Sequence, residues 1–462
     1  MPKVMKYLLL IVIIFSATIG FAEDNLDEII RKHPRLNIAI QVKNLKTGQE
    51  IYSHNSNKLL IPASVTKSFT TYAALEYLGA DFIYDTQVLF NKNQINSDGT
   101  LLGDLYIKFS GDPSLSKEEF SKLIASLKQY NIKAITGNII LDDSMFDQAH
   151  QADGWSSEDS KFCFNAPASA IVINKNCFYL NLSPAKTIGK ITELKGYSVA
   201  KLVENKIITK DDMSCSPELK AESNNIYRLS GCLDAKSKDL PLSIAYQDPR
   251  LMMYILIKNL LKEQLIKHKE IYFLNTIPPE YQVMLEHKSA PLSMLIKQMH
   301  KDSDNIAANN ISKTIGAYYY KTQGNFTNGS KAIEEILASK TKINFSEMRI
   351  IDGSGSSRYN LIAPDHLVNL FYSAYHNSKV WANFQESLPI IGIDGTLAKR
   401  LIDNSELHGK ILAKTGYMTG VATISGYILE KDLVFAVMIN GYVGPRNELH
   451  KLVDQILITL LK

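Results

Sequence analysis

Residues 62–67 read Pro-Ala-Ser-Val-Thr-Lys and open a stretch in which apolar side chains recur with helical spacing until Gly79. A proline near the start and a glycine after the end are typical of a helix. A serine in the first turn lies beside unpaired backbone N–H groups, and a lysine three residues later lies over the same face. The stretch therefore predicts a helix over residues 65–78, with Ser64 and Lys67 as close neighbours.

Two short motifs follow far downstream, Ser303-Asp-Asn305 and Lys414-Thr-Gly416. The first is predicted to begin a helical segment that runs to about Ile315. The second lies on the first of three strand-like runs, which continue at residues 420–429 and 433–440 with turn signals between them. We therefore expect consecutive antiparallel strands at the third motif.

Each motif alone is weak evidence, because short patterns of common residues recur by chance. Residues 114–117 and 183–186 repeat the Ser-x-x-Lys pattern, but they fall in turn-rich or proline-containing segments. Residues 46–48 repeat Lys-Thr-Gly, but they read as a hairpin turn between strand-like runs at 36–42 and 50–53. Order and surroundings separate the three motifs from these repeats.

The first two motifs carry groups that suit nucleophilic catalysis. A serine hydroxyl such as that of Ser64 becomes an effective nucleophile when a neighbouring base takes its proton. Lys67 can be that base if burial and a nearby positive charge, which Lys414 would supply, lower its pKa. Ser303 can relay a proton, and Asn305 can hydrogen-bond a substrate amide.

The third motif suits the binding of an anionic substrate group. Lys414 and Thr415 offer a cation and a hydroxyl that can hold a carboxylate, and Gly416 lets a substrate backbone lie close. The alternative is purely structural, with Ser64 and Ser303 as helix N-caps and Lys67 solvated. The presence of all three motifs in order favours the catalytic interpretation.

The three motifs resemble those of the penicillin-recognising serine enzymes. From Ser64 to Ser303 is 303 − 64 = 239 residues, and this wide gap resembles the D-alanyl-D-alanine carboxypeptidase/endopeptidase family of class C penicillin-binding proteins. The resemblance spans roughly residues 36–441. Further segments similar to that family are Gly103-Asp-Leu105, Ser110-Gly-Asp-Pro-Ser114, Asn165-Ala-Pro167, Asp352-Gly-Ser-Gly355, Ser357-Arg-Tyr-Asn-Leu361 and Gly392-Ile-Asp-Gly-Thr-Leu397.

The resemblance implies an α+β multidomain fold. Its catalytic domain would be β-lactamase/transpeptidase-like, an antiparallel sheet flanked by helices, with a large β-rich insertion between the first two motifs. We expect residues 23–80 and 289–462 to form this discontinuous domain and 81–288 the insertion, with a subdomain near 89–142.

The resemblance also implies a serine-type D-Ala-D-Ala carboxypeptidase or D,D-endopeptidase that acts on peptidoglycan stem peptides and cross-links without cofactor or metal. β-Lactam antibiotics would acylate Ser64 and inhibit it. The backbone N–H groups of Ser64 and Tyr417 would form the oxyanion hole. A serine β-lactamase, a transpeptidase and a non-enzymatic peptidoglycan-binding scaffold are the alternatives, but the wide gap disfavours the first and the retained Ser64 and Lys67 disfavour the last.

Four further acidic or basic residues are candidates for roles in substrate binding or in shaping the site. If the stem peptide contains diaminopimelate, Arg358 and Asp159 are reasonable partners for its carboxylate and ammonium groups. Arg358 has the alternative role of bonding loop carbonyls. Asp352 and Asp394 lie in glycine-rich turns, where an aspartate shapes either the site or simply the turn.

The N-terminus predicts export. Lys3 and Lys6 precede a short apolar run, and small residues lead to Ala22, so residues 1–22 read as a signal peptide of a periplasmic protein. An uncleaved anchor is the alternative, but the apolar run is short for a membrane span.

The cysteines Cys163, Cys177, Cys215 and Cys232 all lie in the insertion. An even number in an exported chain predicts two disulfides, for which three pairings are open. Nearest-neighbour pairing is favoured, because it closes short loops that each stabilise by about 3 kcal/mol. Free thiols are an alternative, and a zinc site is disfavoured because no Cys-x-x-Cys is present.

The charge balance is mild, with 51 basic and 47 acidic residues, a net charge of +4 and a pI near 8.5. Scattered lysines give no support to nucleic-acid binding, and at most a peripheral association with a membrane is expected. The last apolar helical pattern, residues 452–461, is predicted to pack on the catalytic sheet rather than on a membrane. The oligomeric state is left open.

Overall fold

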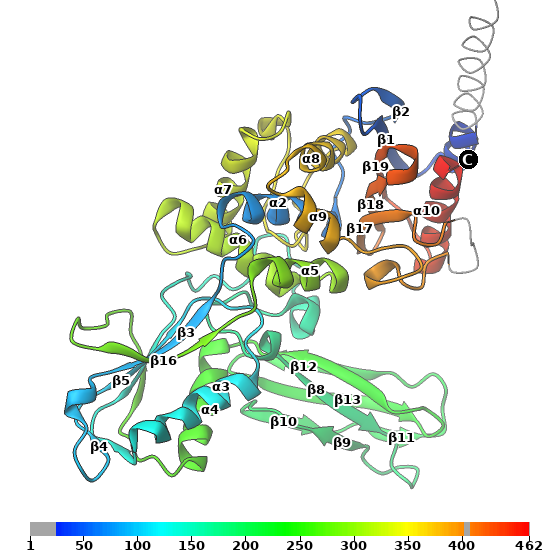
Figure 1. Cartoon of the computed structure of the whole chain (residues 1–462). Helices are drawn as coiled ribbons and strands as arrows, with labels where there is room; N and C mark the ends of the chain where they lie inside the picture. The colour runs from blue at the N-terminus through cyan, green and yellow to red at the C-terminus, as the bar shows by residue number, and fades with distance from the viewer. Residues whose placement is uncertain (1–24, 402–406, 462) are drawn as a thin grey trace, which may run out of the picture. The chain divides into compact units, whose positions relative to one another are not determined.

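The computed structural model describes residues 25–401 and 407–461 (Figure 1), so the predicted signal peptide lies outside the described residues. The chain forms two compact units. The first contains the described residues up to Ala80, Ile296–Asp304 and the described residues from Ser330 onward. The second contains Asp81–Leu295 and Asn305–Gly329. These units describe how the chain packs. They do not test the predicted domain bounds, which remain a prediction.

The first unit is built on a five-stranded sheet with the order β17-β18-β19-β1-β2. Each neighbouring pair in it is antiparallel, as predicted for the catalytic sheet. Its strands are β1 (Asn37–Asn44), β2 (Glu50–His54), β17 (Ile411–Met418), β18 (Val421–Ile428) and β19 (Leu433–Asn440).

Alternating side chains give this sheet two buried faces. On β18, Ala422, Ile424 and Ile428 share a core with the apolar side chains of helix α10 (Arg446–Leu461). This helix lies beside the sheet in Figure 1. The predicted packing of the last helix on the sheet is confirmed. The helix begins six residues before the predicted start, because Pro445 precedes it and Glu448 lies favourably in its first turn.

The opposite face of the sheet packs against α8 (Pro364–His376). The hydroxyl of Tyr427 on β18 donates to the carbonyl of Phe371 on α8 over 2.7 Å, and Lys43 on β1 donates to Asn369 over 2.9 Å. The other α-helices that contribute to the first unit are α2 (Lys67–Tyr77), α5 (Leu292–Asp302), α7 (Phe326–Ala338) and α9 (Trp381–Ser387).

The second unit contains several sheets. A five-stranded sheet has the order β15-β7-β5-β3-β16, a three-stranded sheet β14-β8-β9, and a further group joins β10, β11 and β12 to β13. The strands are β3 (Asp85–Phe90), β4 (Thr100–Leu101), β5 (Leu105–Phe109), β6 (Ala134–Ile135), β7 (Ile139–Asp142), β8 (Cys177–Ser183), β9 (Glu193–Gly196), β10 (Leu202–Asn205), β11 (Ile208–Lys210), β12 (Pro217–Glu222), β13 (Ile226–Asp234), β14 (Leu240–Ala245), β15 (Ile271–Phe273) and β16 (Gln282–Lys288).

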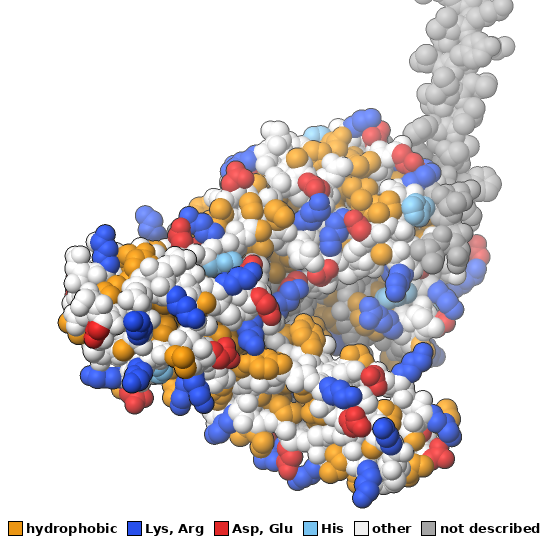
Figure 2. Space-filling model, turned by 60° about the horizontal axis from the view of Figure 1, so that its bottom comes forward, with side chains coloured by type: hydrophobic (Ala, Val, Ile, Leu, Met, Phe, Trp, Pro, Cys, Tyr) orange, Lys and Arg blue, Asp and Glu red, His pale blue; other side chains and the backbone are white. Residues whose placement is uncertain are grey.

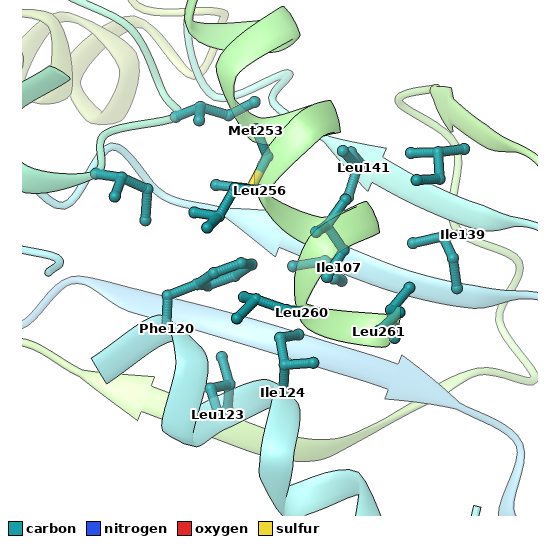
Figure 3. Close-up of a cluster of buried hydrophobic side chains, with 14 of the residues drawn as sticks. Ile107, Phe120, Leu123, Ile124, Ile139, Leu141, Met253, Leu256, Leu260 and Leu261 are labelled. Carbon is teal, nitrogen blue, oxygen red and sulfur yellow. The ribbon is translucent and has the colours of Figure 1, made fainter. Parts of the chain in front are cut away.

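This β-rich unit also contains two helices that the sequence interpretation did not single out, α3 (Lys117–Ala125) and α4 (Pro249–Glu263). Both have strong start signals, since Ser116 and Glu119 form a capping box and Asp248 caps α4 ahead of Pro249. Figure 3 shows how α3 and α4 bury their apolar faces on β5 and β7. The labelled side chains of this core are Ile107, Phe120, Leu123, Ile124, Ile139, Leu141, Met253, Leu256, Leu260 and Leu261.

Two disulfides join Cys163 to Cys177 and Cys215 to Cys232. They close loops of 14 and 17 residues. The nearest-neighbour pairing is thus present in the structure. Within the described ranges, each helix is too short or too polar to span a membrane.

The core of the second unit depends on α4, which gives a test of its stability. Leu256 is 1% exposed, so Leu256→Ala should leave a cavity and lower the free energy of unfolding by about 2–5 kcal/mol. The exposed Asn259→Ala on the same helix is the control and should change stability by less than about 0.5 kcal/mol. Urea denaturation followed by circular dichroism measures both, and equal stability of the two variants would contradict the assigned packing.

Candidate active site

Ser64 lies in a 3₁₀ turn, η1 (Ala63–Thr66), that leads directly into α2. The residue before it, Ala63, has φ +49°, a left-handed conformation that is strained for a residue with a Cβ. The hydroxyl of Ser64 does not cap the helix and instead accepts a hydrogen bond from Lys67 Nζ over 2.8 Å. The helix ends after Tyr77, with Gly79 at φ +90°, as the sequence predicted.

Lys67 is fully buried, although its side chain ends in an amine. Its Nζ donates to the Ser64 hydroxyl and, over 2.7 Å, to the carbonyl of Ser354. Burial lowers its pKa to about 7, against the opposing effect of Asp352 and Asp304, whose negative charges favour the ammonium form. A substantial fraction of Lys67 is therefore neutral near pH 7 and able to take a proton.

Burial is the dominant cause of this low pKa. The pKa of Lys414 also lies well below its ordinary value, because of burial and then of the positive charge of Lys67. The repulsion between the two ammonium groups is mutual, as expected from the sequence. Because Lys414 is also fully buried, protonation of one lysine disfavours protonation of the other.

A helix begins at the Ser303-Asp-Asn305 motif, as predicted, because α6 (Asn305–Tyr320) starts at its last residue and runs five residues past the predicted end at Ile315. Ser303 itself has φ +58° and lies between the end of α5 and the start of α6. A left-handed residue breaks the helical path, so the serine hydroxyl faces a neighbouring strand. It accepts a hydrogen bond from Lys414 Nζ over 3.0 Å.

Lys414, Thr415 and Gly416 lie on β17, as predicted. Lys414 also donates to the carbonyl of Thr415 over 2.7 Å, and the Thr415 hydroxyl is 2.7 Å from that of Thr396. Gly416 must be a glycine, because a Cβ there would lie 2.9 Å from the backbone nitrogen of Ser64. This close approach brings the edge of the sheet against the turn that carries Ser64.

A buried carboxylate organises the loop that holds Lys67. Asp352 is fully buried and accepts hydrogen bonds from the backbone N–H groups of Gly355, Ser356 and Ser357 and from the side chains of Ser354 and Asn360, over 2.8–3.2 Å. The loop thereby presents the Ser354 carbonyl to Lys67. Asp352 therefore shapes the site, beyond being a turn residue.

Two residues that sequence reasoning did not single out support Ser303. Lys301 Nζ binds both carboxylate oxygens of Asp394 over 2.8 and 2.7 Å, which ties the end of α5 to the segment that carries Thr396. His300 is fully buried between the hydroxyls of Thr71 and Ser387, at 2.9 and 2.8 Å, and burial keeps its pKa well below its ordinary value. In the sequence, the glycine-rich turn around Asp394 was the only feature that could have indicated these contacts.

The remaining predicted residues have individual contacts. Arg358 donates to the carbonyl of Thr419 over 3.2 Å, the structural role that was its alternative. The ring of Tyr417 lies 4.0 Å from the Arg446 guanidinium.

Two of the predicted residues lie in the second unit. There the side chain of Asn305 donates to the carbonyl of Phe164 over 2.6 Å, and Asp159 begins the short 3₁₀ turn η4 (Asp159–Lys161). Among the described residues, no cluster of three or more His, Cys, Asp or Glu side chains could hold a metal ion.

An antiparallel sheet between helices, with paired Ser64–Lys67 and Ser303–Lys414 side chains, defines a penicillin-recognising serine enzyme. Residues 22–457 match the model of the D-Ala-D-Ala carboxypeptidase 3 (S13) family. The chain belongs to this family. The predicted family and fold class are confirmed.

The relatives agree with this assignment. The chain is 33% identical to D-alanyl-D-alanine carboxypeptidase DacB of Haemophilus influenzae over 91% of this chain and 89% of that protein. It resembles the crystal structure of penicillin-binding protein 4 from the same organism, with a TM-score of 0.87, 31% identity, and coverage of 95% of this chain and 99% of that one. A structure of that protein complexed with a β-lactam matches with a TM-score of 0.81 and 30% identity over the same fractions.

The Asp352 loop gives a second test. Asp352→Asn should lower the free energy of unfolding by about 2–4 kcal/mol, because an amide cannot accept all the hydrogen bonds that the buried carboxylate accepts. The exposed Glu347→Gln nearby should leave stability nearly unchanged. Chemical denaturation compares the variants, and an unaffected Asp352→Asn protein would remove Asp352 from its organising role.

Proposed function

We propose that this protein is a serine-type D-Ala-D-Ala carboxypeptidase or D,D-endopeptidase that cleaves peptidoglycan stem peptides and cross-links through an acyl-enzyme on Ser64. The observation that carries this proposal is the 2.8 Å hydrogen bond between Ser64 Oγ and the amine of Lys67, whose pKa is about 7. A neutral lysine at that distance is a competent general base.

Acylation begins when neutral Lys67 takes the Ser64 proton as Oγ attacks the carbonyl carbon of the scissile D-Ala-D-Ala bond. The N–H groups of Ser64 and Tyr417 stabilise the oxyanion. The C–N bond then breaks, and a proton passed through Ser303 neutralises the departing amine. The proton that Lys67 takes from Ser64 is balanced by the one that the leaving group gains, so the step changes no net proton count.

Deacylation repeats these steps with water in place of Ser64. A β-lactam enters by the same attack, but its leaving amine stays tethered within the acyl group. The relative from Haemophilus influenzae that was crystallised with a β-lactam supports this chemistry for the present chain.

Substrate recognition would use the second lysine. Lys414 and Thr415 bind the terminal carboxylate, and Asn305 has the role of bonding the amide on the acyl side. Arg358 and Asp159 remain proposed partners for a diaminopimelate side group, although the bond from Arg358 to the Thr419 carbonyl competes with that role.

The proposed location is the periplasm, where peptidoglycan is accessible and the two disulfides would be stable. On the face shown in Figure 2, Lys and Arg side chains are interspersed with acidic and uncharged ones, and no nucleic-acid partner is proposed. Any membrane association would be peripheral.

Labelling with a fluorescent penicillin tests the nucleophile. The mature protein should form a covalent adduct, seen as a fluorescent band and a matching increase in intact mass, and Ser64→Ala should form none. Ser114→Ala, in another Ser-x-x-Lys segment, is the matched control and should label like the parent. Labelling of a folded Ser64→Ala protein, or no labelling of the parent, would refute the mechanism.

The pH dependence of acylation tests the base. Protonated Lys67 cannot accept a proton, so the second-order rate of penicillin acylation should fall as pH drops below about 7, approaching tenfold per pH unit, and level off above it. The apparent midpoint belongs to the coupled Lys67–Lys414 pair, while burial keeps the pKa of the nearby His300 well below its ordinary value. A rate that is flat or increases toward pH 5, with circular dichroism unchanged, would exclude Lys67 as the base.

A further inference from the structure

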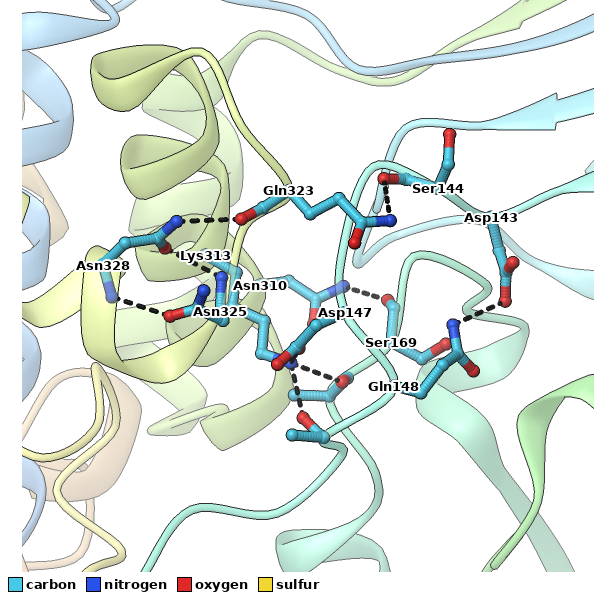
Figure 4. A network of polar contacts seen from close by, with 12 residues as sticks. Asp143, Ser144, Asp147, Gln148, Ser169, Asn310, Lys313, Gln323, Asn325 and Asn328 are labelled. Carbon is cyan, nitrogen blue, oxygen red and sulfur yellow. Dashed lines mark hydrogen bonds and ion pairs between the residues drawn. The ribbon is translucent and has the colours of Figure 1, made fainter. Parts of the chain in front are cut away.

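The second unit contains a surface pocket of about 340 Å³ beside the loop that follows β7. Figure 4 shows part of its wall, where side chains of this loop meet residues that follow α6. This volume lies near the lower end of the usual range for small-ligand sites, roughly 300–1,000 Å³. Its lining includes Asp143, Ser144, Gln148, Arg250, Phe273 and Gln323.

The charges at this pocket compensate one another. Arg250 binds Asp143 with two hydrogen bonds of 2.8 and 2.9 Å, and buried Lys313 binds Asp147 over 2.9 Å. Two carboxylates are thus matched by two cations. A pocket of this kind favours a neutral, hydrogen-bonding ligand over an ion.

The polar wall is held in place before any ligand arrives. Lys313 also donates to the Ala149 carbonyl over 2.6 Å, and Gln323 donates to the Ser144 carbonyl over 3.0 Å. Gln148 donates to Asp143 over 3.2 Å. Residues fixed by such a network lose little entropy when a ligand binds.

The pocket also has an apolar platform. The Arg250 guanidinium lies 5.0 Å from the centre of the Phe273 ring, which is a cation–π distance. Leu274, which is 54% exposed, also lines the pocket, as do the exposed amide side chains of Gln148, Asn275 and Gln323. An apolar plane next to amide and carboxylate groups fits a sugar ring, which has C–H groups on its faces and hydroxyls at its edge.

We propose that this pocket binds an uncharged N-acetylhexosamine residue of a glycan strand, and so gives the second unit a role in holding peptidoglycan. The identification of the ligand rests on the proposed function, because peptidoglycan supplies such glycans next to the cleaved peptides. A stem peptide fits less well, since its free carboxylates would find no uncompensated cation here.

Titration of the mature protein with a chitin tetrasaccharide, followed by calorimetry, tests the proposal. Phe273→Ala and Gln323→Ala should each weaken binding about tenfold, the expected effect of removing one well-placed contact. Tyr272→Ala is the matched control, because Tyr272 is 48% exposed on the same strand but points to the other face. It should bind the sugar like the parent.

Penicillin labelling of the same samples shows that each variant is folded and separates this proposal from the proposed function. Sugar binding without labelling would refute the enzymatic function and leave the pocket supported. Labelling without sugar binding would overturn the pocket assignment, as would equal affinities of the parent, Phe273→Ala and Gln323→Ala. Binding of a free stem peptide that Phe273→Ala abolishes, with no sugar binding, would show a peptide site instead.

Discussion

The structure depends on one costly arrangement, the complete burial of the Lys67 amine against Ser64. Removing an ammonium group from water is strongly unfavourable, so the lysine lowers its pKa and becomes a base. The turn that carries Ser64, the Ser354 carbonyl and the carboxylate of Asp352 are all placed around this amine. A more solvated lysine would add less desolvation cost to folding, but it would remain protonated at neutral pH.

Backbone strain at the site is maintained by the core around it. Ala63 and Ser303 both adopt left-handed conformations, which cost of order 1 kcal/mol or more each. Gly416 and Gly355 then allow neighbouring chain segments to lie against the turn at Ala63 and Ser64. The sheet, with α8 on one face and α10 on the other, supplies the burial that keeps these conformations populated.

Sequence patterns predicted the parts of this arrangement that are local. The run at residues 433–440 coincides with β19, and the apolar side of the last helix packs where its spacing indicates. The left-handed Ser303 could not be predicted, because a serine near a helix start looks like an ordinary cap. Contacts such as Lys301 with Asp394 and Thr415 with Thr396 join distant segments, and a short motif carries no information about them.

The two buried lysines also explain how a substrate can activate the site. In the empty site each ammonium group disfavours the other, so the pair holds protons weakly. A substrate carboxylate beside Lys414 favours the charged form of that lysine. The charge of Lys414 then opposes protonation of Lys67, which keeps the base neutral while the scissile carbonyl lies near Ser64. Under the proposed function, in which Lys414 binds the terminal carboxylate and Lys67 is the base, substrate binding and activation of the nucleophile would therefore be coupled through the electrostatics of one small buried region.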